Sequence, residues 1–382
     1  MNDVMATWTP TSRVFDLQSG SLRPNLAPPS QGVISLAMGE PDFETPVQIV
    51  EAAKQALVDG HTHYADQQGL PALREVIATN LPGTTDLSAS DILVTHGATG
   101  ALAALVLSAV GPGDRVVIPE PGYSLYADLV RLAGGTVDFV PLAANKHWDY
   151  ALLGEKLPGA RMFVFSNPSN PTGVCHTRHE LELLGEVLEG TQTLVVADEA
   201  YDRLVSPEVA FTSALEIDSL SGRVAYVQTF SKTFAMTGWR VGYLAAPRTV
   251  LKGALQMHRT FNGSVNTANQ FGALRALTME PEVIEPMLSE YDRRRKIVVE
   301  ELASVEGISL IEPKGAFYAL PRYSGTKPSA IVAEELKERG VLVRSGAEYG
   351  PSGEYHFRIS FAASEDEIRE GISRIRSYFG RS

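Results

Sequence analysis

Lys232 has the side chain best suited to covalent chemistry in this sequence. It follows the apolar run 224–228 and lies in the segment TFSKTFAMTGWRVGY, residues 229–243, which also contains Arg240. A lysine at the end of a buried strand loses hydration, which lowers its pKa and makes the neutral amine available for imine formation. A solvated strand-end lysine is the alternative. The neighbouring hydroxyl groups and the Arg240 guanidinium favour a phosphate bound close to the amine.

A glycine-rich turn offers a second place for a phosphate. The segment ILVTHGATGALAALVL, residues 92–107, runs from a strand-like stretch through Gly97-Ala98-Thr99-Gly100 directly into a helix-like stretch. Small residues there let backbone N–H groups approach an anion at the positive end of the helix dipole. The segment has neither the Gly-Lys-Ser/Thr of a Walker loop nor the three-glycine dinucleotide spacing. Taken alone, a glycine-rich turn from strand to helix is more often a tight connection that binds nothing.

Two more polar positions follow apolar runs. Asp198 closes the run in LVVADEAYDRL, residues 194–204, and Tyr201 comes three positions later. Open α/β sheets bind ligands beyond the carboxyl ends of their strands, although a helix N-cap also explains one aspartate. Asn170 lies in the turn VFSNPSNPTG, residues 164–173, where it presents an amide to the same crevice or only forms the turn. The four segments together predict a phosphate cradle, an amine, a carboxylate and an amide at one rim.

The elements that must position these groups alternate between strand and helix. Short apolar runs typical of strands buried on both faces lie at residues 92–95, 116–119, 137–140, 162–166, 194–197 and 224–229. Helix-like stretches lie at residues 47–58, 101–110, 124–132 and 178–188. This alternation predicts an α/β fold, with a mostly parallel sheet between helices.

The C-terminal part has a different pattern. After about residue 282 a charged amphipathic helix is followed by strand-like segments at 308–313, 315–321, 341–344 and 357–362, and by a final helix over 365–379. This order predicts a smaller α+β domain. Residues 1–46 are rich in proline and predict an extended arm. We therefore expect a large domain over 47–281, and a small domain formed by 282–382 together with the arm 1–46.

Composition limits the remaining possibilities. The chain has 382 residues, with 33 Lys and Arg against 45 Asp and Glu, so its formal net charge is -12. That balance disfavours a general nucleic-acid or anionic-membrane surface. The single cysteine, Cys175, can form neither an intramolecular disulfide nor a thiolate metal cluster, and we predict no metal site. With no signal-like start and no run of about 18 apolar residues, a cytoplasmic location is expected.

These motifs resemble one family over essentially the whole chain. SNPSNPTG, the Asp198-x-x-Tyr201 pair and SKTFAMTGWRVGY are similar in order and separation to those of the class I/II aminotransferases that depend on pyridoxal 5'-phosphate (PLP). These enzymes belong to the aspartate aminotransferase superfamily. The resemblance implies the fold of PLP-dependent transferases of fold type I, whose large domain contains a seven-stranded, mostly parallel sheet. Its motifs identify the cofactor more securely than the reaction.

The resemblance also implies roles for individual residues. Lys232 would form the internal aldimine with PLP and then move the proton between the substrate and the cofactor. Asp198 would contact the pyridine nitrogen, where a buried carboxylate keeps the ring protonated as an electron sink. Tyr201 and Asn170 would contact the phenolic oxygen. The catalytic residues implied in this way are Lys232, Asp198 and Tyr201.

Further residues are assigned to cofactor and substrate binding by the same resemblance. Tyr123 would stack on the cofactor ring, and its phosphate would contact Ala98, Thr99, Thr229, Ser231 and Arg240. Tyr64 matches a tyrosine that reaches the phosphate of the neighbouring subunit, which implies a homodimer with shared active sites. Arg358 would bind the substrate's α-carboxylate. The backbone of Gly39 would add a second substrate contact, next to Asn170.

The predicted reaction is transfer of the α-amino group of an L-amino acid to a 2-oxo acid by a ping-pong mechanism. A PLP-dependent lyase, cyclase or oxidase on the same scaffold is the alternative, and a non-catalytic PLP sensor is a third hypothesis.

Position 99 is threonine, where some aspartate-specific relatives carry lysine, so a neutral, aromatic or otherwise large side chain is favoured in the amino donor. Arg259 is a weak counter-argument, because another branch has a distal-carboxylate arginine nearby. An exposed helix-end arginine is its simpler interpretation.

Overall fold

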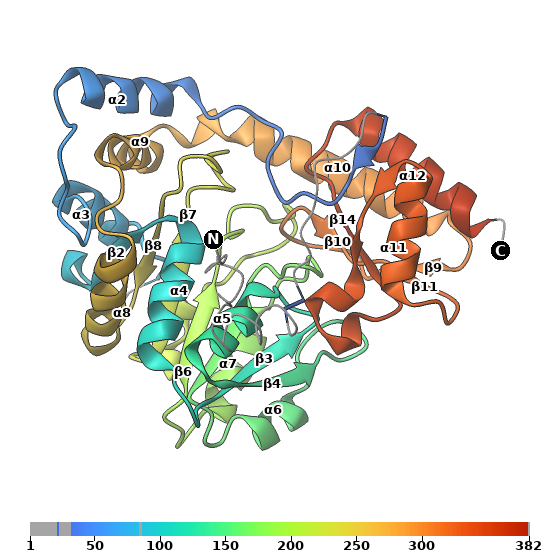
Figure 1. Ribbon diagram of the computed structural model, residues 1–382, viewed down its shortest axis with the longest axis horizontal. Helices are drawn as coiled ribbons and strands as arrows, with labels where there is room; N and C mark the ends of the chain where they lie inside the picture. The colour runs from blue at the N-terminus through green and yellow to red at the C-terminus, as the bar shows by residue number, and fades with distance from the viewer. Residues whose placement is uncertain (1–20, 23–31, 84–85, 381–382) are drawn as a thin grey trace, which may run out of the picture.

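A seven-stranded sheet forms the centre of the larger part of the molecule (Figure 1). The computed structural model describes residues 21–22, 32–83 and 86–380. The strands lie in the spatial order β2 (Ile92–Thr95), β8 (Gly242–Ala245), β7 (Val224–Thr229), β6 (Leu194–Asp198), β5 (Met162–Ser166), β3 (Arg115–Glu120) and β4 (Thr136–Pro141). The predicted mostly parallel, seven-stranded sheet is therefore confirmed.

The two ends of this sheet differ from the predicted pattern. Strand β8 is antiparallel to both β7 and β2, so β2 and β7 still run in the same direction. Strand β4 forms an edge, and only Val140 of its six residues is buried. The interpretation of 137–140 as a strand buried on both faces is wrong, because an edge strand keeps one side of its backbone and part of its surface open.

Helices cover both faces of the sheet, and the alternation of buried side chains explains why. One face packs on α4 (Gly97–Ala109), α5 (Leu125–Ala133) and α8 (Arg248–Phe261), through a core that includes Leu93 and Val164. The other face packs on α2 (Val47–Val58), α3 (Pro71–Thr79), α6 (Tyr150–Lys156), α7 (Arg178–Val187) and α9 (Thr267–Thr278), through a core that includes Val94 and Phe163. Successive residues of one strand thus enter different cores, as a pleated strand requires.

The smaller part of the molecule has its own hydrophobic core. It contains α10 (Glu285–Ala303), α11 (Ser329–Glu338) and α12 (Glu365–Phe379). Its strands are short: β9 (Ile308–Ser309), β10 (Tyr318–Ala319), β11 (Arg322–Tyr323), β12 (Val341–Leu342), β13 (Arg344–Ser345) and β14 (Phe357–Ser360). In Figure 1 these elements lie side by side at one end of the central sheet.

The described part of the N-terminal arm joins this second core. Strand β1 (Ile34–Ser35) pairs in parallel with β12, and Leu36 is buried among the residues of the small-part core. The rest of the predicted arm, residues 1–20 and 23–31, lies outside the described residues. The division into domains at residues 47 and 281 stays a prediction. Among the described residues, no helix has the length and apolarity needed to cross a lipid bilayer.

Candidate active site

A cavity of about 670 Å³ lies where the two parts of the molecule meet. Its walls come from the carboxyl ends of the central strands, from the segment after β1 and from the small part. The residues that line it include Ala37, Met38, Gly39, Ala98, Thr99, Leu102, Tyr123, Ser124, Tyr126, Ser166, Asn170, Asp198, Tyr201, Thr229, Ser231, Lys232, Arg240, Tyr318, Leu342, Arg344, Tyr349 and Arg358.

Parallel strand direction brings the predicted groups to one edge of the sheet. Strands β5, β6 and β7 run in parallel, and β2 shares their direction through the antiparallel β8. Their last residues, Ser166, Asp198 and Thr229, all line the cavity, and α4 begins just beyond β2. Ligands of open α/β sheets bind at this edge. The expected gathering of four strand ends is therefore present.

The glycine-rich turn closes one corner of the cavity. Gly97 has φ +69°, a left-handed conformation that disfavours side chains. A Cβ added at Gly97 would lie 2.9 Å from Nη2 of Arg240, so the missing side chain lets the guanidinium approach the start of α4. Thr229 Oγ1 donates to Ser231 Oγ at 2.9 Å beside them. Backbone N–H groups, hydroxyls and a guanidinium thus converge as a set of anion donors.

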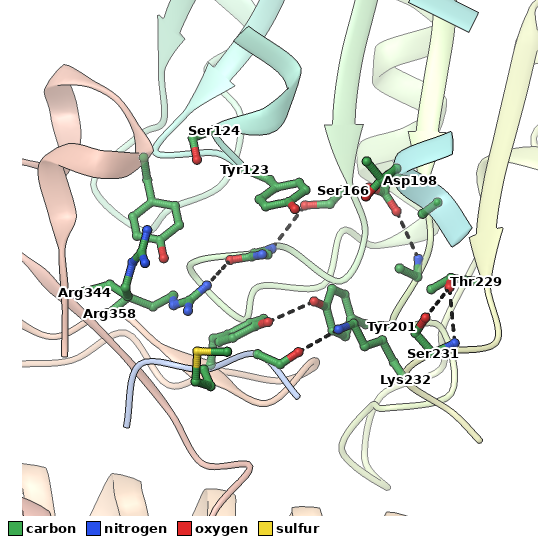
Figure 2. A pocket seen from close by; sticks show the side chains of 18 of the residues that line it. Tyr123, Ser124, Ser166, Asp198, Tyr201, Thr229, Ser231, Lys232, Arg344 and Arg358 are labelled. Atoms are coloured by element: carbon green, nitrogen blue, oxygen red, sulfur yellow. Dashed lines mark hydrogen bonds between the residues drawn. The ribbon is translucent and has the colours of Figure 1, made fainter. Parts of the chain in front are cut away.

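Lys232 points its amine into the cavity from the turn after β7 (Figure 2). Its Nζ donates to the carbonyl oxygen of Gly39 at 2.6 Å. Burial, helped by the charges of Arg240 and Arg358, lowers the pKa of Lys232 to about 8, although the carboxylates of Glu40 and Asp198 oppose the shift. An appreciable fraction of neutral amine is therefore present near neutral pH, which is the state needed to attack a carbonyl carbon.

Asp198 is 5% exposed, at the end of β6. Tyr126 donates its hydroxyl hydrogen to Oδ2 at 2.8 Å, and the backbone N–H of Ala200 donates to Oδ1 at 3.3 Å. Burial raises the pKa of Asp198 to about 6 in spite of these hydrogen bonds. A carboxylate in this setting gains from a cationic N–H group placed against it, because that partner would offset the cost of desolvation.

Tyrosine side chains connect the sheet to the small part. The hydroxyls of Tyr201 and Tyr318 lie 3.0 Å apart, and either one is able to donate (Figure 2). A Cβ added at Gly39 would overlap the Tyr318 hydroxyl, so the close packing of Tyr318 against the backbone of residue 39 requires glycine there. The arrangement holds the carbonyl of Gly39 next to Lys232.

Two arginines of the small part face the cavity. Arg358 is buried, donating through Nη1 to Oδ1 of Asn170 at 3.0 Å and through Nη2 to the carbonyl of Ala37 at 2.6 Å. Its Nε has no hydrogen-bond partner among the described residues. Arg344 stands opposite Arg358 in the β13–β14 register and pairs with Glu348 at 2.5 Å. Two guanidiniums and one carboxylate leave this wall with an excess of positive charge.

The family comparison agrees with this geometry. Residues 31–375 match the family model described as aminotransferase class I and II. The chain is a class I/II aminotransferase. It is 36% identical over 376 residues to the aspartate/prephenate aminotransferase of Cereibacter sphaeroides, covering 92% of each chain. It is 35% identical over 354 residues to the aspartate aminotransferase of Pyrococcus horikoshii, covering 90% of each.

Solved aminotransferase structures have the same fold. The crystal structure of the aromatic aminotransferase from Pyrococcus horikoshii OT3 aligns with a TM-score of 0.87 at 34% identity, covering 92% of this chain and 97% of that one. A Thermus thermophilus aspartate aminotransferase mutant also aligns with a TM-score of 0.87, at 31% identity. The predicted family, fold and enzyme class are therefore confirmed.

The aminotransferase cavity gathers every predicted site residue except Tyr64. Tyr64 is 98% exposed, as a residue that reaches toward another subunit would be in an isolated chain. Sequence reasoning missed several lining residues: Tyr126, Ser166, Tyr318, Arg344 and Tyr349. Only Tyr126 had a usable signal in the sequence, because it lies three positions after Tyr123, in the first turn of α5.

Proposed function

We propose that this aminotransferase binds PLP and transfers the α-amino group of an L-amino acid to a 2-oxo acid by a ping-pong mechanism. The observation that carries the proposal is the convergence of Lys232, Asp198 and the Gly97–Arg240 corner in one cavity. A nucleophilic amine, a buried carboxylate and an anion cradle are what an aldehyde, a pyridine nitrogen and a phosphate each require.

The residues of the cavity fit each chemical group of the cofactor. The phosphate would be held by backbone N–H groups at Ala98 and Thr99 together with the side chains of Thr229, Ser231 and Arg240. The absence of a side chain at Gly97 lets the Arg240 guanidinium reach this corner of the cavity. Asp198 would accept from the pyridine N–H, and Tyr123 would stack on the ring. Tyr201 and Asn170 would contact the phenolic oxygen.

When bound, PLP supplies an aldehyde and an electron-withdrawing ring that together allow the α C–H bond of an amino acid to be broken. Lys232 would capture the aldehyde with its neutral amine and later carry the proton removed from the α carbon. Asp198 would keep the proton on the ring nitrogen. Arg358 would orient the α-carboxylate with its free Nε, while the Gly39 backbone and the segment around it exclude water from the α carbon.

The favoured amino donors have neutral, aromatic or otherwise large side chains. Thr99 brings no charge to the phosphate loop, and the walls include the apolar side chains of Met38, Leu102 and Leu342. One similar solved structure is named an aromatic aminotransferase, which supports this preference, whereas the curated relatives reported above are named for aspartate. Arg344 also lines the cavity and is charged, unlike these apolar side chains, although Glu348 balances part of its charge. In the second half-reaction, Arg344 would bind an acidic 2-oxo acid.

A half-reaction experiment tests the proposal. PLP-loaded enzyme is mixed with each of the common amino acids in the absence of an oxo acid. An aminotransferase converts the cofactor's visible absorption to that of its amine form and releases one oxo acid per site. Release of ammonia with an unchanged spectrum would instead indicate a lyase or oxidase. Lys232→Ala is the control, and turnover that survives it would overturn the proposed mechanism.

We also propose a homodimer with shared active sites, located in the cytoplasm. The support for the dimer is exposure: Tyr64 is fully open, and α2 presents Val47, Leu57 and Val58 to solvent. Apolar side chains gathered on one exposed helix are typical of a surface that another chain covers. A Tyr64 hydroxyl from one subunit would then complete the phosphate site of the other.

A further inference from the structure

A cluster outside the active site brings together two histidines and a glutamate. His147, His176 and Glu180 each offer one possible ligand atom, and these three atoms lie within 4.8 Å of one another. They come from three segments: the loop between β4 and α6, the loop between β5 and α7, and the first turn of α7. None of them lines the candidate active site, and none has a role in the proposed reaction.

The glutamate is oriented by the start of its helix. Thr177 and Glu180 form a capping box, in which Oε2 of Glu180 accepts from the Thr177 backbone N–H at 2.8 Å and from its hydroxyl at 2.9 Å. Those bonds occupy one carboxylate oxygen and turn the other, Oε1, toward the imidazoles. The capping box therefore fixes the orientation of the Glu180 carboxylate.

The two histidines are placed differently. His147 is half-buried, and its Nδ1 lies 2.5 Å from Oε1 of Glu180. His176 is only 4% exposed and stacks on the indole of Trp148 with ring centroids 3.7 Å apart. Its Nδ1 lies 3.7 Å from Oε1 of Glu180 and makes no hydrogen bond with any described residue. A plain His147–Glu180 hydrogen bond thus explains one imidazole and leaves a buried polar atom unsatisfied.

We propose that His147, His176 and Glu180 form a binding site for a divalent transition-metal ion such as Zn²⁺. Two imidazole nitrogens and one carboxylate oxygen are a ligand set that suits zinc. Ligand atoms at about 2.0 Å from a tetrahedral ion lie roughly 3.3 Å apart, so the observed spacing needs only small side-chain rotations. The partly open side at His147 leaves a fourth position for water.

Such an ion would act structurally on the active site. The backbone N–H of His176 donates to Oδ1 of Asn167 at 2.9 Å, so His176 anchors the turn that also carries Asn170. A metal ion joining this turn to α7 and to the loop at His147 would restrict its motion.

The test uses the full-length, PLP-loaded protein, treated with a chelator and then titrated calorimetrically with zinc chloride. The proposal predicts one equivalent bound per chain and a rise in the melting temperature. His147→Ala and Glu180→Gln should each weaken binding at least tenfold. His179→Ala is the matched control, because His179 is an exposed histidine next to Glu180 and outside the cluster. It should bind zinc like the wild type.

Two results would overturn the proposal. One is the absence of a one-to-one binding phase in the wild-type protein. The other is zinc binding that persists unchanged in both His147→Ala and Glu180→Gln, since the ion would then lie at other histidines. His147 is partly exposed, so its alanine variant should fold, and far-ultraviolet circular dichroism of each variant checks this before titration.

Discussion

Asp198 is held in surroundings that disfavour its charge. Its pKa is raised from 3.8 to about 6 by burial, so the folded carboxyl retains its proton over a range in which an unfolded aspartate has lost it. The stability that this difference contributes is complete below pH 3.8 and is lost as the pH rises through 6. Above pH 6 the cofactor-free protein therefore contains a buried anion that only a cationic partner would compensate.

Asp198→Asn should stabilise the cofactor-free enzyme at pH 8 by at most about 3 kcal/mol, since one pKa unit corresponds to about 1.4 kcal/mol. The amide oxygen is still able to accept from Tyr126, so that hydrogen bond survives. Urea unfolding at pH 8 and pH 4 measures the effect, which should vanish at pH 4. The same variant should lose transamination activity. If Asp198→Asn changed the free energy of unfolding relative to the wild type by the same amount at both pH values, the raised pKa would be contradicted.

Lys232 should capture the PLP aldehyde with a pH dependence set by its own amine. Because the pKa is lowered to about 8, the rate at saturating PLP should rise about tenfold per pH unit below 8 and level off above it. Stopped-flow absorbance of the cofactor-free enzyme measures this rate. Glu40→Gln should shift the midpoint to lower pH, because Glu40 raises the pKa. A rate that climbs steadily to pH 10 would indicate an ordinary solvated lysine.

Single residues were predictable from sequence where a motif marked them, and not where distant segments meet. Lys232, Asp198 and Asn170 each follow an apolar run, so their place at the sheet edge followed from strand direction. Arg344 also follows an apolar run, residues 341–343, but that run belongs to the small part and not to the parallel sheet whose strand direction places the other three. Its position in the cavity depends on its pairing opposite Arg358 across two short strands, a register that becomes visible only once the small part has folded.

The short apolar runs that alternate with helix-like stretches predicted the parallel strands well. Helix α2 and strands β5 and β7 have the bounds expected from their periodicity. Strand β8 was missed because the alternating pattern predicts only strands that are separated by helices. No helix separates β8 from β7, since antiparallel neighbours can be joined by a short connection. The exposed edge of β4 was missed because strand order in the sheet cannot be obtained from apolar content alone.

The start of α4 should be sensitive to one added methyl group. Gly97→Ala places a Cβ in a left-handed conformation and 2.9 Å from Arg240 Nη2, so the guanidinium must move away from the phosphate corner. We expect a cofactor Kd raised about tenfold, which is about 1.4 kcal/mol. Gly159→Ala is the matched control, because φ there is +73° and no atom of the described residues would lie within 4 Å of the added Cβ.

Both variants should lose about 1 kcal/mol of stability from backbone strain, but only Gly97→Ala should release PLP more readily. Fluorescence titration of the cofactor-free proteins with PLP separates the two effects. If Gly159→Ala weakened cofactor binding equally, general destabilisation rather than the corner at Gly97 would be responsible.

For the whole molecule, a net charge of -12 coexists with an electropositive cavity. Lys232, Arg240, Arg344 and Arg358 all line it, against Asp198 as the single lining carboxylate among the described residues. Local charge, rather than the total, decides which ligands enter, because a cleft with low-dielectric walls focuses the field. The acidic surface therefore gives no argument against a phosphate or a carboxylate at this site.

Mixing two inactive variants tests whether one molecule completes the site of another. If Tyr64 serves the neighbouring subunit, a heterodimer of Lys232→Ala and Tyr64→Ala chains contains one site with both residues intact. Random exchange makes about half of the dimers mixed, so activity at limiting PLP should recover to about a quarter of the wild-type value. If Tyr64 served its own chain, every site would lack one residue and no activity would return. Because Tyr64 is 98% exposed, Tyr64→Ala should leave the fold intact, so failure to recover would count against the shared site rather than against folding.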